Sequence, residues 1–171
     1  AASVRAEAIS SSERGPLAWD PADRSARRSP LSIREAWASI RLARALDLQM
    51  GRFDLGWGRT DGYSPADGFL PRDLSDPLAS EKLPLWGARL QGERGPYRFE
   101  AFATPVTTPW RLPVLDGRYS PVSYAGYFAL DATTPPPAGG FQMARLQRNG
   151  AAWDVGGWVR TGVRPAPLLV P

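Results

Sequence analysis

The chain has 171 residues, of which 43% are hydrophobic and 11% aromatic, and this composition argues against global disorder. Histidine and cysteine are both absent, which excludes thiolate chemistry, Cys/His zinc sites and histidine-based acid–base catalysis. The net charge of +4 comes from arginines scattered along the chain rather than gathered in a patch, so we expect no nucleic acid partner.

No uncharged apolar stretch reaches the roughly 18 residues that a membrane-spanning helix requires. The first ten residues, AASVRAEAIS, lack the apolar centre of a signal peptide. If the protein is exported, we therefore expect this chain to be a mature form or an internal part of a longer sequence.

The 18 prolines delimit the candidate strands, because proline cannot donate a hydrogen bond to a sheet ladder. Between the prolines lie seven segments with strand-like patterning. They are residues 2–9, 32–42, 46–57, 85–91, 97–104, 141–148 and 152–163. The sequence therefore predicts an all-β fold.

The first segment, residues 2–9, alternates alanine and valine with Arg5 and Glu7, so that one face is apolar and the other charged. The same alternation returns in residues 97–104, where aromatic residues and alanines oppose Glu100. This pattern is typical of a strand with two different environments on its two faces.

Residues 32–42 fit two interpretations. Ser32 and Glu35 resemble a helix capping box, and the segment is rich in good helix formers. A strand would instead place Glu35 and Arg41 on the face opposite to Ile40. Local sequence leaves the choice between helix and strand open.

The apolar phase in residues 46–57 slips by one residue at Gly51, which predicts a β-bulge at that glycine. Residues 152–163 return to simple alternation, with valines opposite Asp154 and Arg160.

Short and long connections alternate along the chain. The short ones are residues 43–45, 92–96 and 149–151, the last with an Asn-Gly hairpin signal. The long ones are residues 10–31, 58–84 and 105–140. Short turns on one rim and long loops on the other are typical of an outer-membrane barrel. We therefore predict that residues 1–171 form one unit, the antiparallel strands of a transmembrane β-barrel.

Several spaced motifs resemble a family of proteobacterial outer-membrane β-barrels of largely unknown function, whose members show an REA strand and a "GR…WGR.DG.NP.D…PRD" run. The matching residues are REA at 34–36, GR at 51–52, WGR at 57–59, DG at 61–62, Pro65, Asp67 and PRD at 71–73. The similarity extends through YRFEAFATP and GGFQMARLQRNGAAWDVGGWVRTG, and so covers most of the chain from Ser32 onward.

The resemblance implies a porin-like barrel in the outer membrane of Gram-negative bacteria. Family members are longer than this chain, and the sequence lacks the terminal aromatic strand that such proteins usually carry. Bacterial single-chain barrels have an even number of strands, so we expect the seven strands to belong to a larger barrel.

The main candidate site is a charged lumen wall, made by the polar residues of the alternating segments. These residues are Arg5, Glu7, Glu35, Arg41, Arg89, Arg98, Glu100, Asp154 and Arg160. A water-filled wall of this kind would bias the passage of solutes electrostatically. The alternative is a salt-bridged interior that passes nothing.

A second candidate site is a constriction formed by the loop at residues 58–84. The charged residues expected to form the constriction are Arg59, Asp61, Asp67, Arg72 and Asp73. If the loop folds inward, the arginines should pair with the aspartates, because charges leaving bulk water need partners. Phe69 and Leu70 would then form an apolar wedge against the wall.

Metal binding and catalysis are not expected. In this loop Asp61, Asp67 and Asp73 recur at six-residue intervals, which does not match an EF-hand, and Asp-Gly pairs commonly make turns. Glu100 and Asp154 would have to act together in glycoside hydrolysis, and nothing in the sequence brings them together. We therefore expect no enzyme activity, no metal and no cofactor.

The leading functional hypothesis is an outer-membrane channel for small polar or anionic solutes, with the lipid bilayer as its surroundings. One alternative is a structural barrel that scaffolds or anchors an envelope complex with other envelope proteins. Another is a soluble β-sandwich binding module. Aromatic residues at segment ends would lie at the membrane interfaces in a barrel and in the core of a soluble fold; they are Trp57, Trp86, Tyr97 and Trp153.

Overall fold

The computed structural model describes residues 2–6, 19–25, 27–56, 70–76, 80–113, 129–130, 139–163 and 169–170. Within these ranges the chain is all-β and contains no helix. In the same ranges, no helix has the length and hydropathy to cross a bilayer.

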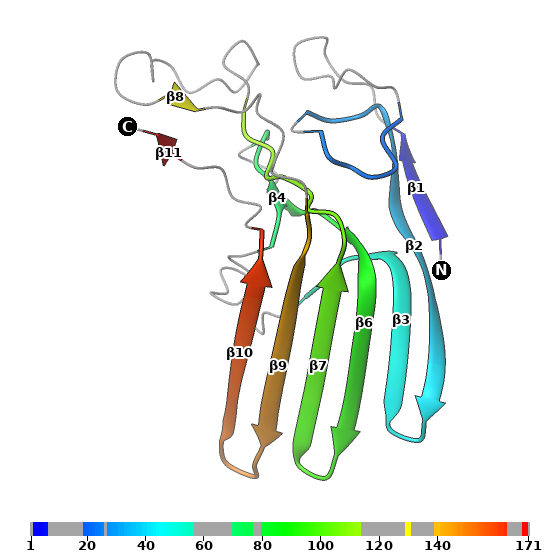
Figure 1. Cartoon of the computed structure of the whole chain (residues 1–171), viewed down its shortest axis with the longest axis vertical. Coiled ribbons are helices and arrows are strands. Elements are labelled where there is room, and N and C mark those ends of the chain that lie inside the picture. The colour runs from blue at the N-terminus through cyan, green and yellow to red at the C-terminus, as the bar shows by residue number, and fades with distance from the viewer. Residues whose placement is uncertain are drawn as a thin grey trace.

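Seven strands form one antiparallel sheet in the order β1-β2-β3-β6-β7-β9-β10 (Figure 1). They are β1 (Ala2–Ala6), β2 (Leu31–Ala43), β3 (Leu46–Phe53), β6 (Leu85–Arg94), β7 (Tyr97–Thr104), β9 (Phe141–Asn149) and β10 (Asp154–Gly162). Each strand overlaps one of the seven predicted segments, although β3 ends at Phe53 rather than at residue 57, and the prediction of an antiparallel all-β fold is confirmed. Among the described strands the sheet is open, with β1 and β10 at its edges, and does not close into a barrel.

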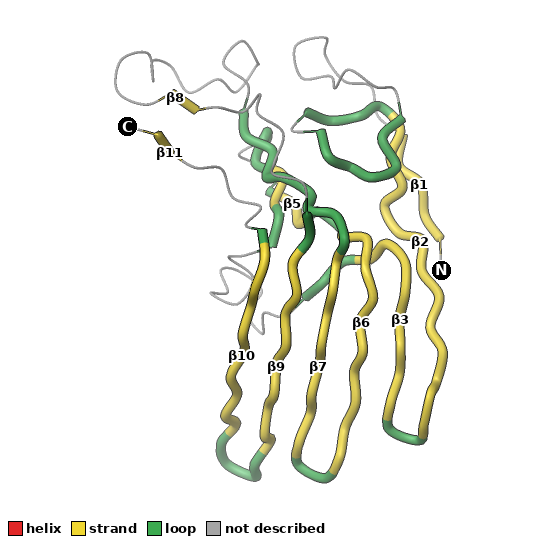
Figure 2. The backbone as a smooth tube through the Cα atoms, in the orientation of Figure 1, coloured by secondary structure: helices red, strands yellow, loops and turns green. Residues whose placement is uncertain are grey.

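Two small ribbons accompany this sheet. β4 (Arg72–Asp73) pairs with β5 (Glu81–Lys82), and β8 (Ala129–Leu130) pairs with β11 (Leu169–Val170). The ribbon of β4 and β5 lies near one end of the large sheet (Figure 2).

The segment that fitted both helix and strand is a strand. β2 pairs with β1 on one side and with β3 on the other, and Ser39 lies opposite Gln49 while Ile40 lies opposite Leu48. Hydrogen bonding to two neighbouring strands outweighs the local preference for a helix.

The β-bulge expected at Gly51 is not present. β3 pairs with β6 without interruption from Leu46 to Phe53, although Gly51 itself has a φ of 128°. The apolar residues change phase because the buried face changes. Met50 belongs to an exposed apolar surface, whereas Phe53 turns to the opposite face and is only 2% exposed.

Three tight turns lie at one end of the sheet, where they join β2 to β3, β6 to β7 and β9 to β10 (Figure 2). Gly95 has a φ of 58° in the second of these turns, a conformation that favours glycine. The connections from β1 to β2, β3 to β6 and β7 to β9 leave from the other end, which we call the long-loop end.

A small hydrophobic core lies at the long-loop end. Its buried residues are Phe53, Leu55, Leu70, Leu85, Phe102, Phe141 and Met143, with Trp37 packed against them. The rings of Phe53 and Phe102 meet edge to face, with centroids 5.9 Å apart. Leu70, which the sequence placed in an apolar wedge, is part of this core, and Phe69 lies outside the described residues.

Candidate functional site

One face of the sheet is apolar over most of its length, and we call it the apolar face. By register and alternation it comprises Ala38, Ile40, Leu48, Met50, Ala88, Leu90, Ala101, Ala103, Ala144, Leu146, Val155 and Val159. One cross-strand row is apolar on all six long strands, and it runs Ile40, Leu48, Leu90, Ala101, Ala144, Val159.

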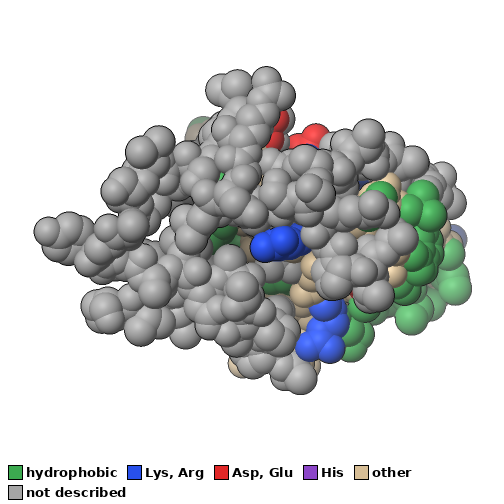
Figure 3. All heavy atoms as spheres, turned by 90° about the horizontal axis from the view of Figure 1, so that it is seen from above, with side chains coloured by type: hydrophobic (Ala, Val, Ile, Leu, Met, Phe, Trp, Pro, Cys, Tyr) green, Lys and Arg blue, Asp and Glu red, His purple; other side chains and the backbone are tan. Residues whose placement is uncertain are grey.

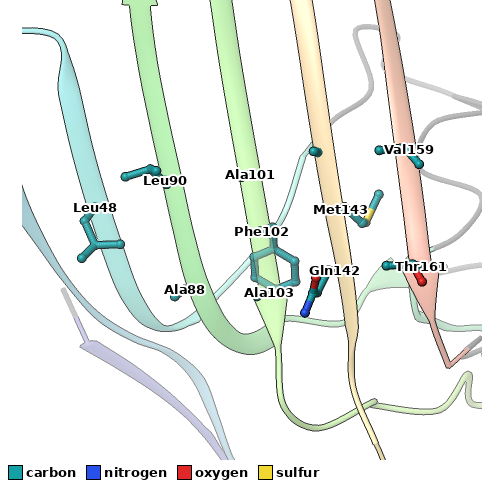
Figure 4. A pocket seen from close by; sticks show the side chains of 11 residues that line it. Leu48, Ala88, Leu90, Ala101, Phe102, Ala103, Gln142, Met143, Val159 and Thr161 are labelled. Atoms are coloured by element: carbon teal, nitrogen blue, oxygen red, sulfur yellow. The ribbon is translucent and has the colours of Figure 1, made fainter.

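This apolar face is open rather than packed under other elements. The relative exposure is 59% for Ile40, 53% for Met50, 55% for Leu146 and 64% for Val159. A shallow depression of about 390 Å³ runs along it, with lining residues from β3, β6, β7, β9 and β10 (Figure 4). Monomeric soluble proteins rarely expose a continuous apolar surface that spans so many strands.

On the six long strands, charged residues enter this side of the sheet only near its ends. Arg94, Tyr97 and Arg148 share one cross-strand row beside the tight turns. Arg148 also lies over the ring of Trp153, at 4.9 Å from the ring centroid. An arginine–aromatic border of this kind suits a surface where an apolar medium meets water.

The opposite face carries charged and polar side chains over the half of the sheet that ends in the tight turns, and we call it the polar face. Its residues are Ser39, Arg41, Asp47, Gln49, Arg89, Gln91, Glu93, Arg98, Glu100, Arg145, Gln147, Asp154 and Arg160. Toward the long-loop end the same face becomes the hydrophobic core described above.

Ion pairs cross the polar face between neighbouring strands. Arg89 Nε lies 2.7 Å from Glu100 Oε1, and the two side chains are only 18% and 7% exposed. Arg41 donates to Asp47 over 3.0 Å, in a much more exposed pair. Beside the tight turn between β6 and β7, Arg98 Nε and Glu93 Oε1 are 3.6 Å apart. Opposite charges are therefore largely paired along the polar face.

The predicted lumen residues fall into three groups. Arg41, Arg89, Arg98, Glu100, Asp154 and Arg160 lie on the polar face, and Glu35 occupies the same face further along β2. Arg5 pairs with Ser32 in the backbone of β1, and its side chain is not described. Glu7 lies outside the described residues.

Several acidic and amide side chains that lie on the polar face were not identified from the sequence. Asp47 and Glu93 pair with arginines that had been identified, and Gln147 accepts a hydrogen bond from Arg145 over 3.0 Å. Hairpin register would have found Asp47, because a tight turn after Ala43 brings it opposite Arg41.

A second site lies at the long-loop end, where five charged residues from four segments meet; we call it the arginine cluster. Its members are Asp23, Arg28, Arg52, Asp73 and Arg111. Viewed from that end, Lys and Arg side chains lie toward the middle of the molecule, with hydrophobic side chains along one side (Figure 3).

Asp23 is the centre of the cluster and is 2% exposed. It accepts from Arg52 Nη2 at 2.5 Å and also from Arg111. Asp20 builds the turn that presents Asp23, since its carboxylate accepts from the backbone N–H groups of residues 23, 24 and 25. Asp23 itself adopts a left-handed conformation, with a φ of 52°, that aspartate tolerates better than most residues.

Asp73 anchors the other side of the cluster. It accepts from Arg28 Nε at 2.8 Å and from the Ser75 hydroxyl, and Arg111 Nη1 lies 3.5 Å away. Burial raises the pKa of Asp73, but the hydrogen bonds from Arg28 and Ser75 and the nearby guanidinium charges outweigh it. The net result is a pKa below the ordinary value for aspartate.

The predicted loop constriction is described only in part. Arg59, Asp61 and Asp67 lie outside the described residues. Arg72 sits in β4, where its carbonyl accepts from the Arg111 backbone N–H at 2.9 Å. The sequence grouped Asp73 with Arg59 and Arg72, whereas its described partners are Arg28 and Arg111.

The structure describes three of the four aromatic residues that were expected at membrane interfaces. Trp86 donates its indole N–H to the carbonyl of Pro21 near the long-loop end. Tyr97 and Trp153 are 48% and 53% exposed beside the tight turns. Trp57 lies outside the described residues.

Neither a metal site nor a known relative identifies the chain. Among the side chains that the structure describes, no group of three or more acidic residues is placed to hold a metal ion. The chain matches no protein-family model, no curated protein and no solved structure. Its function therefore has to be inferred from the two faces of the sheet.

Proposed function

We propose that this chain forms part of a β-barrel in a bacterial outer membrane, with the apolar face toward lipid. The polar face then lines a porin-like lumen for small polar or anionic solutes. The motif resemblance to proteobacterial outer-membrane barrels supports the same proposal.

The observation that carries the proposal is the distribution of polarity over the sheet. The apolar face bears a row of six apolar residues, and the polar face bears Arg89, Glu100 and their charged neighbours. In water this arrangement would leave the apolar area exposed, at a free-energy cost of about 25 cal/mol per Å². In a bilayer the same area is solvated by lipid, and the charges remain in water.

The height of the apolar band fits a membrane. On β6 the apolar positions lie between two bordering residues, Trp86 and Arg94, and the strand spans about 26 Å between these borders at 3.3 Å per residue. A strand tilt of about 40° reduces this to ~20 Å across the bilayer, close to the ~25 Å apolar band of outer-membrane barrels.

A membrane location also requires the edges β1 and β10 to be paired, because unpaired backbone groups cannot face lipid. Further strands of a longer chain or other envelope proteins would provide that pairing. The proposal therefore includes a partner for each edge.

A structural barrel that anchors an envelope complex is the second candidate. The ion pairs Arg89–Glu100 and Arg41–Asp47 favour it, since matched charges hold a lumen closed more readily than unmatched ones. Both candidates share the membrane location and differ only in conductance.

Two arginine substitutions at matched height test the membrane location. Met50 lies on the apolar face and Ser39 lies on the polar face one register position away, and both are exposed. We expect Met50→Arg to cost about 2–4 kcal/mol of stability in lipid vesicles, and Ser39→Arg to cost much less. In a soluble sandwich both exposed positions would accept arginine equally, and that outcome would refute the proposal.

Planar bilayer recordings then separate the two candidates. A channel predicts single-channel conductance with a preference for anions that falls when Arg160 and Arg145 are replaced by glutamine. A correctly folded, membrane-inserted protein without conductance would favour the anchoring role.

A further inference from the structure

The arginine cluster surrounds a small cavity of about 30 Å³. The charged side chains that line this cavity are four arginines and three acids, which gives a net charge of 4 − 3 = +1. The arginines are Arg28, Arg34, Arg52 and Arg111, and the acids are Asp23, Asp73 and Glu81. A net positive charge in so buried a place calls for a compensating anion, because unpaired buried charge is costly.

Three buried side-chain donors on residues that line this cavity have no partner among the described residues. They are the Ser29 hydroxyl and the Nε–H groups of Arg52 and Arg111. The side chains of Arg52 and Arg111 are only 3% and 8% exposed. Buried donors are rarely left without an acceptor, and the described residues leave three of them around one cavity.

The size of the cavity restricts the acceptor. A volume of about 30 Å³ is enough for one or two water molecules or for one monatomic ion. A water molecule would accept from these donors and donate to the carboxylates that also line the cavity, but it would leave the excess positive charge uncompensated. A monovalent halide has no hydrogens to place, acts only as an acceptor and would neutralise the excess charge.

We propose that this cavity is a chloride site, with Ser29, Arg52 and Arg111 as the donors. The ion is a structural part of the long-loop end, where it joins residues 27–30, β3 and the segment after β7. It is distinct from any solute in the lumen, and it does not depend on the membrane location proposed above.

The direct test is anomalous diffraction from crystals of the complete protein grown in bromide. We expect a bromide peak within hydrogen-bonding distance of Nε of both Arg52 and Arg111. Ordered water at that position in bromide, with no anomalous signal, would overturn the proposal.

A solution test uses thermal unfolding in chloride and in gluconate at matched ionic strength. Because the ion binds only the folded state, the unfolding equilibrium constant should fall about tenfold for each tenfold rise in chloride above Kd. Gluconate is too large for the cavity and should have no such effect.

Two variants locate the effect. Arg52→Gln removes a donor and a charge, and we expect the difference between chloride and gluconate to disappear. Arg24→Gln removes an exposed arginine from the same loop outside the cavity, and the difference should persist. A chloride effect that survives Arg52→Gln would place the ion elsewhere and would also overturn the proposal, and if Arg52→Gln does not fold, the bromide experiment decides alone.

Discussion

Replacing Asp23 with asparagine tests whether the arginine cluster determines the stability of the long-loop end. Asp23→Asn keeps the size of the side chain and its tolerance of the left-handed backbone at this position. It removes the carboxylate that accepts from Arg52 and Arg111. The substitution therefore isolates charge from shape.

The expected loss is large because both partners are buried. The side chains of Asp23 and Arg52 are each 3% exposed, and Arg111 is 8% exposed. Breaking one buried ion pair by removing a partner costs about 3–5 kcal/mol, since the remaining charge stays out of water. Asp23 serves two arginines, so we expect the loss to lie toward the upper end of that range.

Urea unfolding followed by tryptophan fluorescence measures this loss. The matched control is Asp47→Asn, which breaks the exposed pair with Arg41, whose side chains are 35% and 73% exposed. Exposed pairs contribute about 0–1 kcal/mol, so the control should unfold almost like the parent protein. If Asp23→Asn cost no more than Asp47→Asn, the reasoning about burial would be wrong.

Further predictions concern pH and packing. The lowered pKa of Asp73 stabilises the fold above the ordinary aspartate pKa of about 3.9, and this contribution should be lost as pH falls through the lowered value. Acid titration of the unfolding free energy should therefore show a weaker decline in Asp73→Asn than in the parent. A Cβ at Gly140 would lie 1.6 Å from the Thr104 carbonyl oxygen, so Gly140→Ala should cost about 1–3 kcal/mol or more in urea unfolding. Gly157→Ala meets nothing within 4 Å and should change stability by less than about 0.5 kcal/mol.

Strand positions could be predicted because two strong local signals agree. Proline is excluded from the interior of a sheet ladder, and side chains along a strand alternate with period two. These two signals located Tyr97–Thr104 to the residue. The end of β3 could not be located in this way. Phe53 continues the apolar pattern on the other face, and only the packing of Phe102 and Phe141 at the long-loop end explains why.

The arginine cluster illustrates what local sequence does not contain. Asp73 stands beside Arg72 in the chain, and proximity in sequence favoured that pair. Successive residues in a strand point to opposite sides, however, so the partners of Asp73 come from distant segments that carry Arg28 and Arg111. Pairing between loops depends on how those loops cross the end of the sheet, and no periodicity encodes it.

The topology constrains how the proposed barrel can close. Seven strands with antiparallel neighbours leave β1 and β10 running in the same direction. A barrel in which every neighbour is antiparallel has an even number of strands, so it must add an odd number of strands to this sheet. Two copies with the same orientation would bring β10 against β1 of the next copy as a parallel pair. Inverting one copy would restore antiparallel pairing, but it would send the two sets of long loops to opposite sides of the membrane. Completion by further strands avoids both the parallel pair and the inverted copy. It also keeps the arginine cluster and the long loops on one side of the membrane.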